Sequence, residues 1–508
     1  MNIEIKLRPE DGEDALARAV LKKSGCGYYK IIKKSLDARD KRNIFWLYSI
    51  RAEKKPIAEP PRAWEQVKRS PRRVVVVGSG PAGLFCAVRL VRAGIKPLVV
   101  ERGGDVHERA SQNEKFFAGG DLDEDCNVQF GEGGAGTFSD GKLNTQTKDP
   151  RNREVLETFV EFGAPPEVLY LNKPHIGSDK LASVVENMRN YILHAGGEVR
   201  FHTRFEGAVL KDGTLRAVRL CDISTGTIYK EGASEVVLAI GHSSRDTFHR
   251  LFEGGYAMQA REFAVGVRIE HLQEKINFTQ YSAKHTLLPP ADYKLVSHAG
   301  ERTVFTFCMC PGGSVIPAAS EAGGVVTNGM SNYARDGRNA NAALLAQVKR
   351  SDFDRGGVLD GVLYQRELER AAFAMGGKTF AAPVQRVEDF LHGRVSSGYG
   401  EVKPTYAAET VPSDLNKLFS PTVSDSLKAG ILDMDRKLHG FADGDALLTA
   451  PETRFSSPVR ILRGEGLESV SARGVYPCGE GCGYSGGITS SAADGIRVAE
   501  VICARYMD

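Results

Sequence analysis

A run of valines, three spaced glycines, an apolar helical segment, a second short apolar run and an acid follow one another early in this chain. Val74–Val77 lead directly into Gly78-x-Gly80-x-x-Gly83, and Glu101 lies 18 residues beyond the last glycine. In a β-α-β unit the first glycine allows a tight turn, the second lets the backbone approach a phosphate, and the third brings helix and strand together. The order therefore predicts a dinucleotide-binding unit.

The same segment indicates where such a ligand is held. Free N–H groups and the positive end of the helix dipole face the phosphates, and a carboxylate at the tip of the second strand accepts hydrogen bonds from ribose hydroxyls. We expect cofactor contacts from the following residues: Gly78, Ser79, Gly80, Pro81, Ala82, Gly83, Glu101 and Arg102.

Length and composition indicate a multidomain globular chain. At 508 residues, two or three domains are expected. Residues 1–8 alternate apolar and polar types instead of forming a signal sequence, and we find no apolar run of the roughly 18 residues that span a bilayer. Nine cysteines without framework spacing suggest reduced thiols. We therefore expect a cytoplasmic protein without a membrane partner.

The N-terminal segment has its own pattern. Strands are predicted over 2–8, 28–35 and 43–51 and a helix over 11–23, followed by the proline-containing linker Glu53–Arg62. Residues 1–70 hold 17 Lys and Arg against 10 Asp and Glu, a net charge of +7, whereas the whole chain carries +3. The excess is typical of a solvated face. Binding of RNA or another anionic partner, or a protein–protein contact, are the alternatives; the oligomeric state stays open.

The remaining patterns predict further elements. Helices are expected at Asp105–Phe117, Asp149–Phe162 and Asp179–His194; strands at Glu198–Leu210, Leu215–Ile223, Thr227–Lys230 and the buried run Glu235–Gly241. Residues 260–450 have mixed character, with strands predicted at Phe263–Ile269 and Thr303–Met309 and helices at Asn339–Arg350 and Leu363–Met375. A glycine-rich loop then precedes a helix that begins near Thr489.

Three motifs in order resemble the FAD-binding fold of the glutathione-reductase type. They are the first glycine unit with Glu101, Ala239-x-Gly241, and Gly479-Glu480. The resemblance implies that Glu480 contacts the ribityl or pyrophosphate region and that the last helix points its N-terminus at the flavin. The further cofactor-binding residues that we expect are Gly133, Gly134, Ala135, Gly136, Ser139, Lys142, Phe205, Gly241, Gly479, Gly487 and Ile488.

Longer phrases resemble a group of bacterial FAD-dependent dehydrogenases, or NAD(P)/FAD-dependent oxidoreductases, without an assigned substrate. They are Lys34–Arg39, Gly133–Lys142, Lys173–Asp179, Phe307–Gly313 and Gly479–Gly487. The implied fold is α/β: a two-part, discontinuous Rossmann-like FAD-binding domain, an inserted mixed α+β substrate domain and a small N-terminal β-α-β-β domain. We place these domains at 1–65, 66–260, 261–450 and 451–508.

The resemblance also implies an oxidoreductase that transfers a hydride or electrons through FAD to or from an unidentified small molecule. The chain has no second GxGxxG behind a strand, so NAD(P)H is expected at most as a transient reductant. Instead, the 260–450 insertion would shape a substrate site over the flavin. A flavin-containing factor of RNA modification, which binds through the basic N-terminal domain, is the alternative.

No catalytic residue follows from the sequence. His175, His242 and His271 are candidate acid–base groups, and Arg268 is a candidate for binding a carboxylate. Tyr484 and Ser485 lie in the expected flavin loop. Cys308-x-Cys310 and Cys478-x3-Cys482 allow a redox pair or, together, a four-thiolate metal site. Their spacings match neither the C-x-x-C redox motif nor a zinc knuckle, which favours small buried thiols, so no metal is expected. Cys482 lies closest in sequence to the expected flavin loop.

Overall fold

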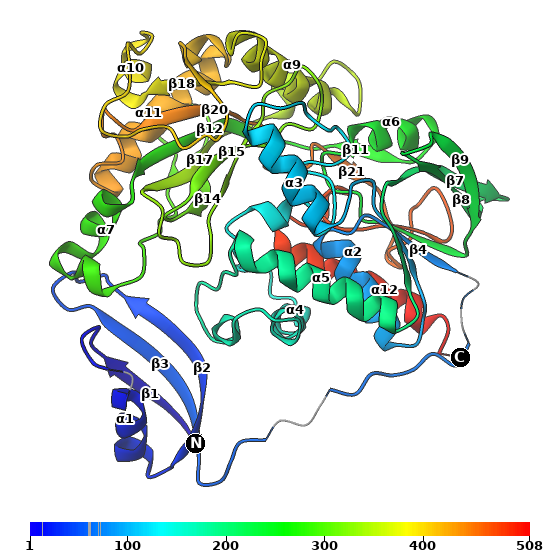
Figure 1. Ribbon diagram of the computed structural model, residues 1–508, viewed down its shortest axis with the longest axis horizontal. Helices are drawn as coiled ribbons and strands as arrows, with labels where there is room; N and C mark the ends of the chain where they lie inside the picture. Colours follow the sequence, from blue (N-terminus) through cyan, green and yellow to red (C-terminus); the bar gives the residue numbers. More distant parts are fainter. Residues whose placement is uncertain (13, 59–61, 70, 72, 508) are drawn as a thin grey trace.

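The computed structural model describes residues 1–12, 14–58, 62–69, 71 and 73–507. The described residues form six β-sheets, of which a three-stranded N-terminal sheet, a five-stranded parallel sheet and a seven-stranded mixed sheet form the cores of three units (Figure 1). The linker residues 59–61, which include two of the three expected prolines, lie outside the described residues, as does Arg72 beside the first valine run. Within the described part of the chain, no helix combines the length and the apolar character that crossing a bilayer requires.

The N-terminal unit is a three-stranded antiparallel sheet in the order β1–β3–β2 with one helix on it. Its elements are β1 (Asn2–Leu7), α1 (Asp14–Ser24), β2 (Tyr28–Asp37) and β3 (Phe45–Glu53). Leu16 and Val20 of α1 pack against Ile3, Ile5 and Ile50 of the sheet. The predicted β-α-β-β order is confirmed. Alternating apolar residues give this sheet one apolar face, and α1 covers it.

The second sheet is fully parallel, in the order β22–β10–β4–β5–β6. Its strands are β4 (Val74–Val77), β5 (Leu98–Val100), β6 (Glu198–Arg200), β10 (Glu235–Leu238) and β22 (Val475–Pro477). Val74 and Val76 face one side of the sheet while Val75 and Val77 face the other, and all four are buried. A continuous apolar run suits this position, since both faces of a parallel sheet are covered.

Helices cover the face of Val74 and Val76, where α2, α5 and α12 lie together (Figure 1). The helices and turns of this region are α2 (Pro81–Arg92), α3 (Val106–Phe117), η1 (Ala135–Phe138), α4 (Arg151–Glu161), η2 (Pro166–Leu169), α5 (Ser178–His194) and α12 (Ile488–Ala504). The opposite face is covered by a three-stranded antiparallel sheet and α6. These elements are β7 (Thr203–Lys211), β8 (Thr214–Asp222), β9 (Thr227–Gly232) and α6 (Arg245–Glu253).

The third sheet is mixed and has seven strands in the order β13–β14–β17–β12–β20–β18–β19. These are β12 (Phe263–Leu272), β13 (Val296–Ser297), β14 (Val304–Cys310), β17 (Asn339–Val348), β18 (Ala382–Arg386), β19 (Thr410–Pro412) and β20 (Leu447–Glu452). The remaining elements are α7 (Gln273–Tyr281), η3 (Ser282–Leu287), α8 (Arg350–Phe353), α9 (Asp360–Met375), α10 (Val387–His392), η4 (Leu415–Lys417), α11 (Pro421–Lys437), β11 (Met258–Ala260), β15 (Ser314–Pro317), β16 (Thr327–Met330) and β21 (Val459–Ile461).

The parallel sheet is discontinuous in sequence, because the strands of the mixed sheet lie between β10 and β22. The predicted fold class is therefore confirmed: a two-part Rossmann-like unit, an inserted mixed unit and a small N-terminal unit.

Two predicted elements are wrong. The single strand expected at Glu198–Leu210 is divided into β6 of the parallel sheet and β7 of the antiparallel sheet. Asn339–Arg350 is expected to be helical, but Asn339–Val348 forms β17, a strand between β12 and β14. Its alanines and leucines favour a helix when only local propensity counts. In the structure, β17 pairs with a strand on each edge and is buried on both faces, and these interactions outweigh the local preference for a helix. Its small alanine side chains allow other elements to pack closely on this central strand.

The burial of β17 on both faces can be tested at two neighbouring positions. Ala346 is fully buried, whereas Gln347 is partly exposed and its amide lies 3.2 Å from the Glu262 carboxylate. Ala346→Lys should lower the free energy of unfolding by more than about 3 kcal/mol, because it buries an unpaired charge. Gln347→Lys, the matched control, should change it by less than about 1 kcal/mol. Equal effects in urea denaturation would contradict the strand.

Candidate functional site

The three glycines after β4 differ in whether their backbone conformation and surroundings allow a side chain. At Gly78 the backbone φ is +97°, and a Cβ would lie 2.3 Å from the Ala239 carbonyl oxygen. At Gly83 a Cβ would lie 1.9 Å from the Gly78 carbonyl oxygen. Both positions therefore require glycine for the turn and for helix–strand packing, as the sequence predicts.

Gly80 has no such requirement. Its φ of −71° suits any residue, and the nearest atom to an added Cβ is the Gly134 Cα at 3.7 Å, an ordinary contact. Gly80 is the N-cap of α2, and no side chain caps this helix end. The free space and the uncapped N–H groups fit the close approach of a phosphate.

The second glycine loop packs directly on the first. Gly133 donates its N–H to the Ser79 carbonyl oxygen at 3.0 Å, and a Cβ on Gly134 would lie 2.9 Å from the Gly80 Cα. On its other side, a Cβ on Gly136 would lie 3.1 Å from the side chain of Ile488. Two loops far apart in sequence, together with the start of α12, thus meet at one place.

Glu101 joins these loops through its carboxylate, which is almost fully buried. One oxygen accepts from the backbone N–H and the hydroxyl of Ser79, each at 2.8 Å. The other accepts from the N–H of Gly103 at 3.1 Å and of Gly131 at 3.0 Å. Four accepted hydrogen bonds are the usual capacity of a carboxylate. Glu101 therefore organises the turn, and the ribose contact that the sequence predicts would have to replace one of these four hydrogen bonds.

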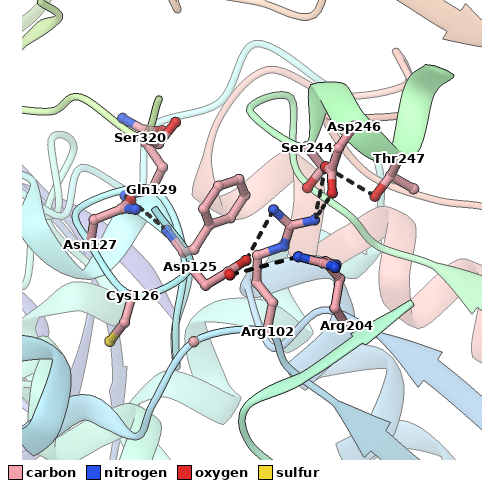
Figure 2. Close-up of polar contacts among 12 residues, drawn as sticks. Arg102, Asp125, Cys126, Asn127, Gln129, Arg204, Ser244, Asp246, Thr247 and Ser320 are labelled. Carbon is pink, nitrogen blue, oxygen red and sulfur yellow. Dashed lines mark hydrogen bonds and ion pairs between the residues drawn. The ribbon is translucent and has the colours of Figure 1, made fainter. Parts of the chain in front are cut away.

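Arg102 is held by ion pairs within the chain (Figure 2). Its guanidinium donates to both oxygens of Asp246 at 2.8 Å, lies 3.6 Å from Asp125 and stands over the ring of Phe130. Burial raises the pKa of Asp246, but Arg102 and then Arg250 outweigh burial and lower it to about 2. Arg102 thus ties its loop to α6.

The C-terminal loop meets the end of β10. A Cβ on Gly481 would lie 2.2 Å from the Gly241 carbonyl oxygen, and the Gly479 N–H donates to Asp494 at 2.8 Å. Sequence reasoning missed Asp494, although an acid within the apolar helix α12 is a usable signal. Gly241 and Gly487 have positive φ and open space beside the Cα.

His242 is placed between two carboxylates. Its Nδ1 lies 3.0 Å from a carboxylate oxygen of Glu480. Its Nε2 is buried and has no hydrogen-bond partner among the described residues. On the side of the mixed sheet, burial raises the pKa of Glu452, and Arg268 followed by His242 acts in the opposite direction. An imidazole with one oriented and one unsatisfied nitrogen is a group that a ligand can complete.

Loop residues 139–143 connect the glycine loops to the other units. The hydroxyl of Ser139 donates to the Gly136 carbonyl oxygen at 2.6 Å, and Thr489 in the first turn of α12 donates to the Leu143 carbonyl oxygen at 2.8 Å. Lys142 extends to the mixed sheet, where its ammonium donates to the Met309 carbonyl oxygen. Phe205 is buried in the hydrophobic cluster on the other face of the parallel sheet, which also contains Ile240 and Cys482.

The other candidate residues make contacts within the chain. Arg268 is fully buried and forms a two-point ion pair with Glu452, at 2.9 and 3.1 Å. His175 and His271 each use Nε2 on a backbone carbonyl oxygen, at 3.0 and 2.9 Å, and burial lowers the pKa of both. The Tyr484 hydroxyl donates to the Ile461 carbonyl oxygen at 2.9 Å.

The four singled-out cysteines separate into two kinds. Cys478 and Cys482 are fully buried, burial raises the pKa of both, and the Cys482 thiol donates to the Leu238 carbonyl oxygen. Cys308 and Cys310 lie at the end of β14 in the mixed sheet. No cluster of three or more metal-ligating side chains occurs in the described ranges.

Family models match three parts of the chain. "FAD-dependent protein, C-terminal domain-like" matches residues 262–455, "NAD(P)-binding Rossmann-like domain" matches 76–130, and a domain of unknown function (DUF8436) matches 1–53. An uncharacterized protein of Clostridium beijerinckii is 44% identical over 528 residues, which cover 99% of this chain and 98% of that protein.

Solved structures are more distant. A geranylgeranyl bacteriochlorophyll reductase-like protein from Thermoplasma acidophilum is 12% identical, with 86% of this chain and 78% of that chain covered and a TM-score of 0.37. The glycerol-3-phosphate dehydrogenase from Bacillus halodurans complexed with FAD is 11% identical, with 87% and 65% covered and a TM-score of 0.38. With TM-scores below 0.5, these likenesses add nothing to the sequence family match.

The role of Glu101 can be tested by removing its charge. Glu101→Gln places an amide NH2 where two N–H donors converge, so the free energy of unfolding should fall by about 2 kcal/mol or more. Glu108→Gln is the control, since Glu108 is exposed and contacts only His202 among the paired charges, at 3.0 Å. It should change stability by less than about 0.5 kcal/mol. Similar urea midpoints for both variants would contradict this role.

Proposed function

The chain belongs to the same family as the uncharacterized Clostridium beijerinckii protein, and we propose that it is an FAD-dependent oxidoreductase acting on a small molecule. The observation that carries the proposal is Gly80, a glycine at an uncapped helix start for which the rest of the chain gives no packing reason. A backbone that must approach a pyrophosphate supplies that reason. The match of residues 262–455 to the FAD-dependent C-terminal domain supports the choice of FAD.

The proposed cofactor contacts follow from the loops that meet. Gly80–Gly83 would face the pyrophosphate, and the turn that Glu101 holds would face the adenosine ribose. Gly479 and Glu480 would lie along the ribityl chain, with Gly487 and Ile488 at the start of α12 beside the ring system. FAD would supply the transfer of a hydride or of electrons.

Residues of the chain itself would orient and polarise the bound flavin. The uncapped N-terminus of α12 places positive partial charge next to the loop of Gly486 and Gly487. The Nδ1 of His242 lies 3.0 Å from Glu480, and its buried Nε2, which has no hydrogen-bond partner among the described residues, would be available to a ligand. His242 therefore stands as a positioning group between the parallel and the mixed sheets.

The reductant is a separate question. Anaerobic mixing of the purified flavoprotein with NADH and with NADPH in parallel should bleach its visible absorbance with at least one of them, if NAD(P)H visits transiently as we propose. The absence of bleaching with both would leave the flavin assignment intact and remove NAD(P)H as the electron donor.

The N-terminal unit is docked on the rest of the chain, which favours a structural role for it. The Lys34 N–H donates to the Tyr170 carbonyl oxygen at 2.7 Å, and the Asn172 N–H donates to the Lys34 carbonyl oxygen at 2.9 Å. Ile44, in the β2–β3 turn, is fully buried in the core of the mixed-sheet unit. Binding of RNA through this unit stays the alternative prediction.

Gly80→Ala tests the proposed function without disturbing the fold. The added methyl meets no atom of the chain closer than 3.7 Å, so the free energy of unfolding of the cofactor-free protein should be unchanged. The same methyl fills the space beside the proposed pyrophosphate. We expect FAD affinity to fall at least tenfold, about 1.4 kcal/mol.

The control is Gly398→Ala, which also adds a methyl in open space but lies between α10 and β19 of the mixed-sheet unit. It should retain about one FAD per chain, measured by chromatography after heat release. Full retention of FAD by Gly80→Ala would contradict the proposal, as would a wild-type protein that neither contains FAD nor binds it when added.

A further inference from the structure

β14 ends in an irregular turn that places two cysteines next to each other. Phe307 pairs with Ala343 and Cys310 pairs with Asn341, so β14 has one residue more than β17 between these pairs. This is a β-bulge, a device that redirects side chains and is common beside active sites. Cys308 lies in the bulge with a φ of +44°, a conformation that side-chain-bearing residues rarely adopt.

The bulge brings the two thiols together at different depths. Cys310 is fully buried, and its Sγ lies 3.2 Å from the Cys308 carbonyl oxygen. Cys308 is partly exposed. The bulge breaks the regular alternation of the strand and turns the Cys310 Sγ back onto the Cys308 backbone. Of these two residues, Cys308 is therefore the more exposed, and Cys310 lies in the core.

Two cations bind the backbone of the bulge. Arg268, fully buried, donates to the Cys308 carbonyl oxygen at 3.0 Å, and the Lys142 ammonium donates to the Met309 carbonyl oxygen. The hydrogen bond from Cys310, followed by the charges of Arg268 and Lys142, lowers the pKa of Cys308 against the effect of burial. The pKa of Cys310 is raised.

This environment sets Cys308 apart from the other thiols. Burial raises the pKa of the remaining cysteines for which a shift is resolved, namely Cys86, Cys126, Cys478, Cys482 and Cys503. A cysteine that only fills core volume requires neither a left-handed backbone nor two cations at the bulge. Both features are characteristic of a reactive thiolate.

We propose that Cys308 and Cys310 form a reversible redox pair that reduces a low-molecular-weight disulfide, with Cys308 as the nucleophile and Cys310 as the resolving thiol. The partial exposure of Cys308 favours a small disulfide over a folded protein as the substrate. This activity is independent of the proposed flavin.

The reaction balances in two exchanges. The Cys308 thiolate attacks one sulfur of the substrate disulfide, forms a mixed disulfide and releases the first substrate thiolate, which takes a proton from water. Cys310 then loses its proton, attacks the Cys308 Sγ and releases the second substrate thiol. The substrate gains two electrons and two protons, and the chain gains a Cys308–Cys310 disulfide. An external dithiol returns the pair to the reduced state by the reverse exchanges.

The first test measures thiol reactivity in the full-length protein. Iodoacetamide alkylation is followed by peptide mass spectrometry at several pH values. Cys308 should react at least tenfold faster at pH 7 than Cys482, and its rate should reach half its maximum below about pH 7.5, the upper end of the range for activated thiols. A rate no greater than that of Cys482, or a midpoint near the ordinary thiol pKa of about 8.5, would overturn the proposal.

The second test identifies the two roles with oxidised glutathione. Wild-type protein should form the Cys308–Cys310 disulfide, seen as a peptide lighter by two hydrogens, which dithiothreitol reverses. Cys310→Ala should instead accumulate glutathione on Cys308, because no resolving thiol is present. Cys308→Ala should leave Cys310 unmodified. The matched control Cys482→Ala should behave as wild type.

Failure of the wild-type protein to form this disulfide, or of Cys310→Ala to trap glutathione, would contradict the redox pair. The wild-type result does not depend on how the variants fold, and circular dichroism checks the variants. Because neither measurement uses the flavin, a failure here leaves the proposed FAD site untouched.

Discussion

The carboxylate of Glu101 is the interaction on which the candidate site depends. Its oxygens accept hydrogen bonds from Ser79, Gly103 and Gly131, which belong to the turn after β4, the residue stretch after β5 and the second glycine loop. A buried charge is tolerated only when such donors satisfy it. Once these three segments are joined, Gly80 and the second loop have only one relative placement, and the start of α2 stays open.

The second organising feature is a line of charges between the two large sheets. Arg268 pairs with Glu452 inside the mixed sheet, and His242 lies between Glu452 and Glu480 of the C-terminal loop. Buried ion pairs contribute little net stability, but they define geometry, since leaving one partner alone is costly. The bulge of Cys308 is attached to the same arginine. Arg268 therefore joins the bulge of the proposed thiol pair to Glu452, whereas the proposed flavin site and the thiol pair are independent in chemistry.

Much of the fold could be predicted, because its patterns are local. The valine run, the glycine spacing and the helical periodicities identify the parallel sheet and its helices. The error at Asn339–Val348 has the opposite cause: alanine and leucine favour a helix locally, and only pairing with β12 and β14 makes this segment a strand. For the site residues too, partners that are distant in sequence decide the outcome. Arg268 was a candidate for an external carboxylate, but the partner that it meets is Glu452, 184 residues further along the chain.

By itself, the sequence determined the class of fold and pointed to a dinucleotide, because turn glycines, strand runs and a strand-end acid act through backbone geometry within a few dozen residues. The tertiary structure alone decided which polar groups are satisfied and which are left available. Glu101 has all its acceptor positions filled, His242 keeps one nitrogen without a partner among the described residues, and Cys308 rather than Cys482 has its pKa lowered. These properties depend on burial and on charges that folding brings together from distant segments. The spacing of residues along the chain therefore does not predict them.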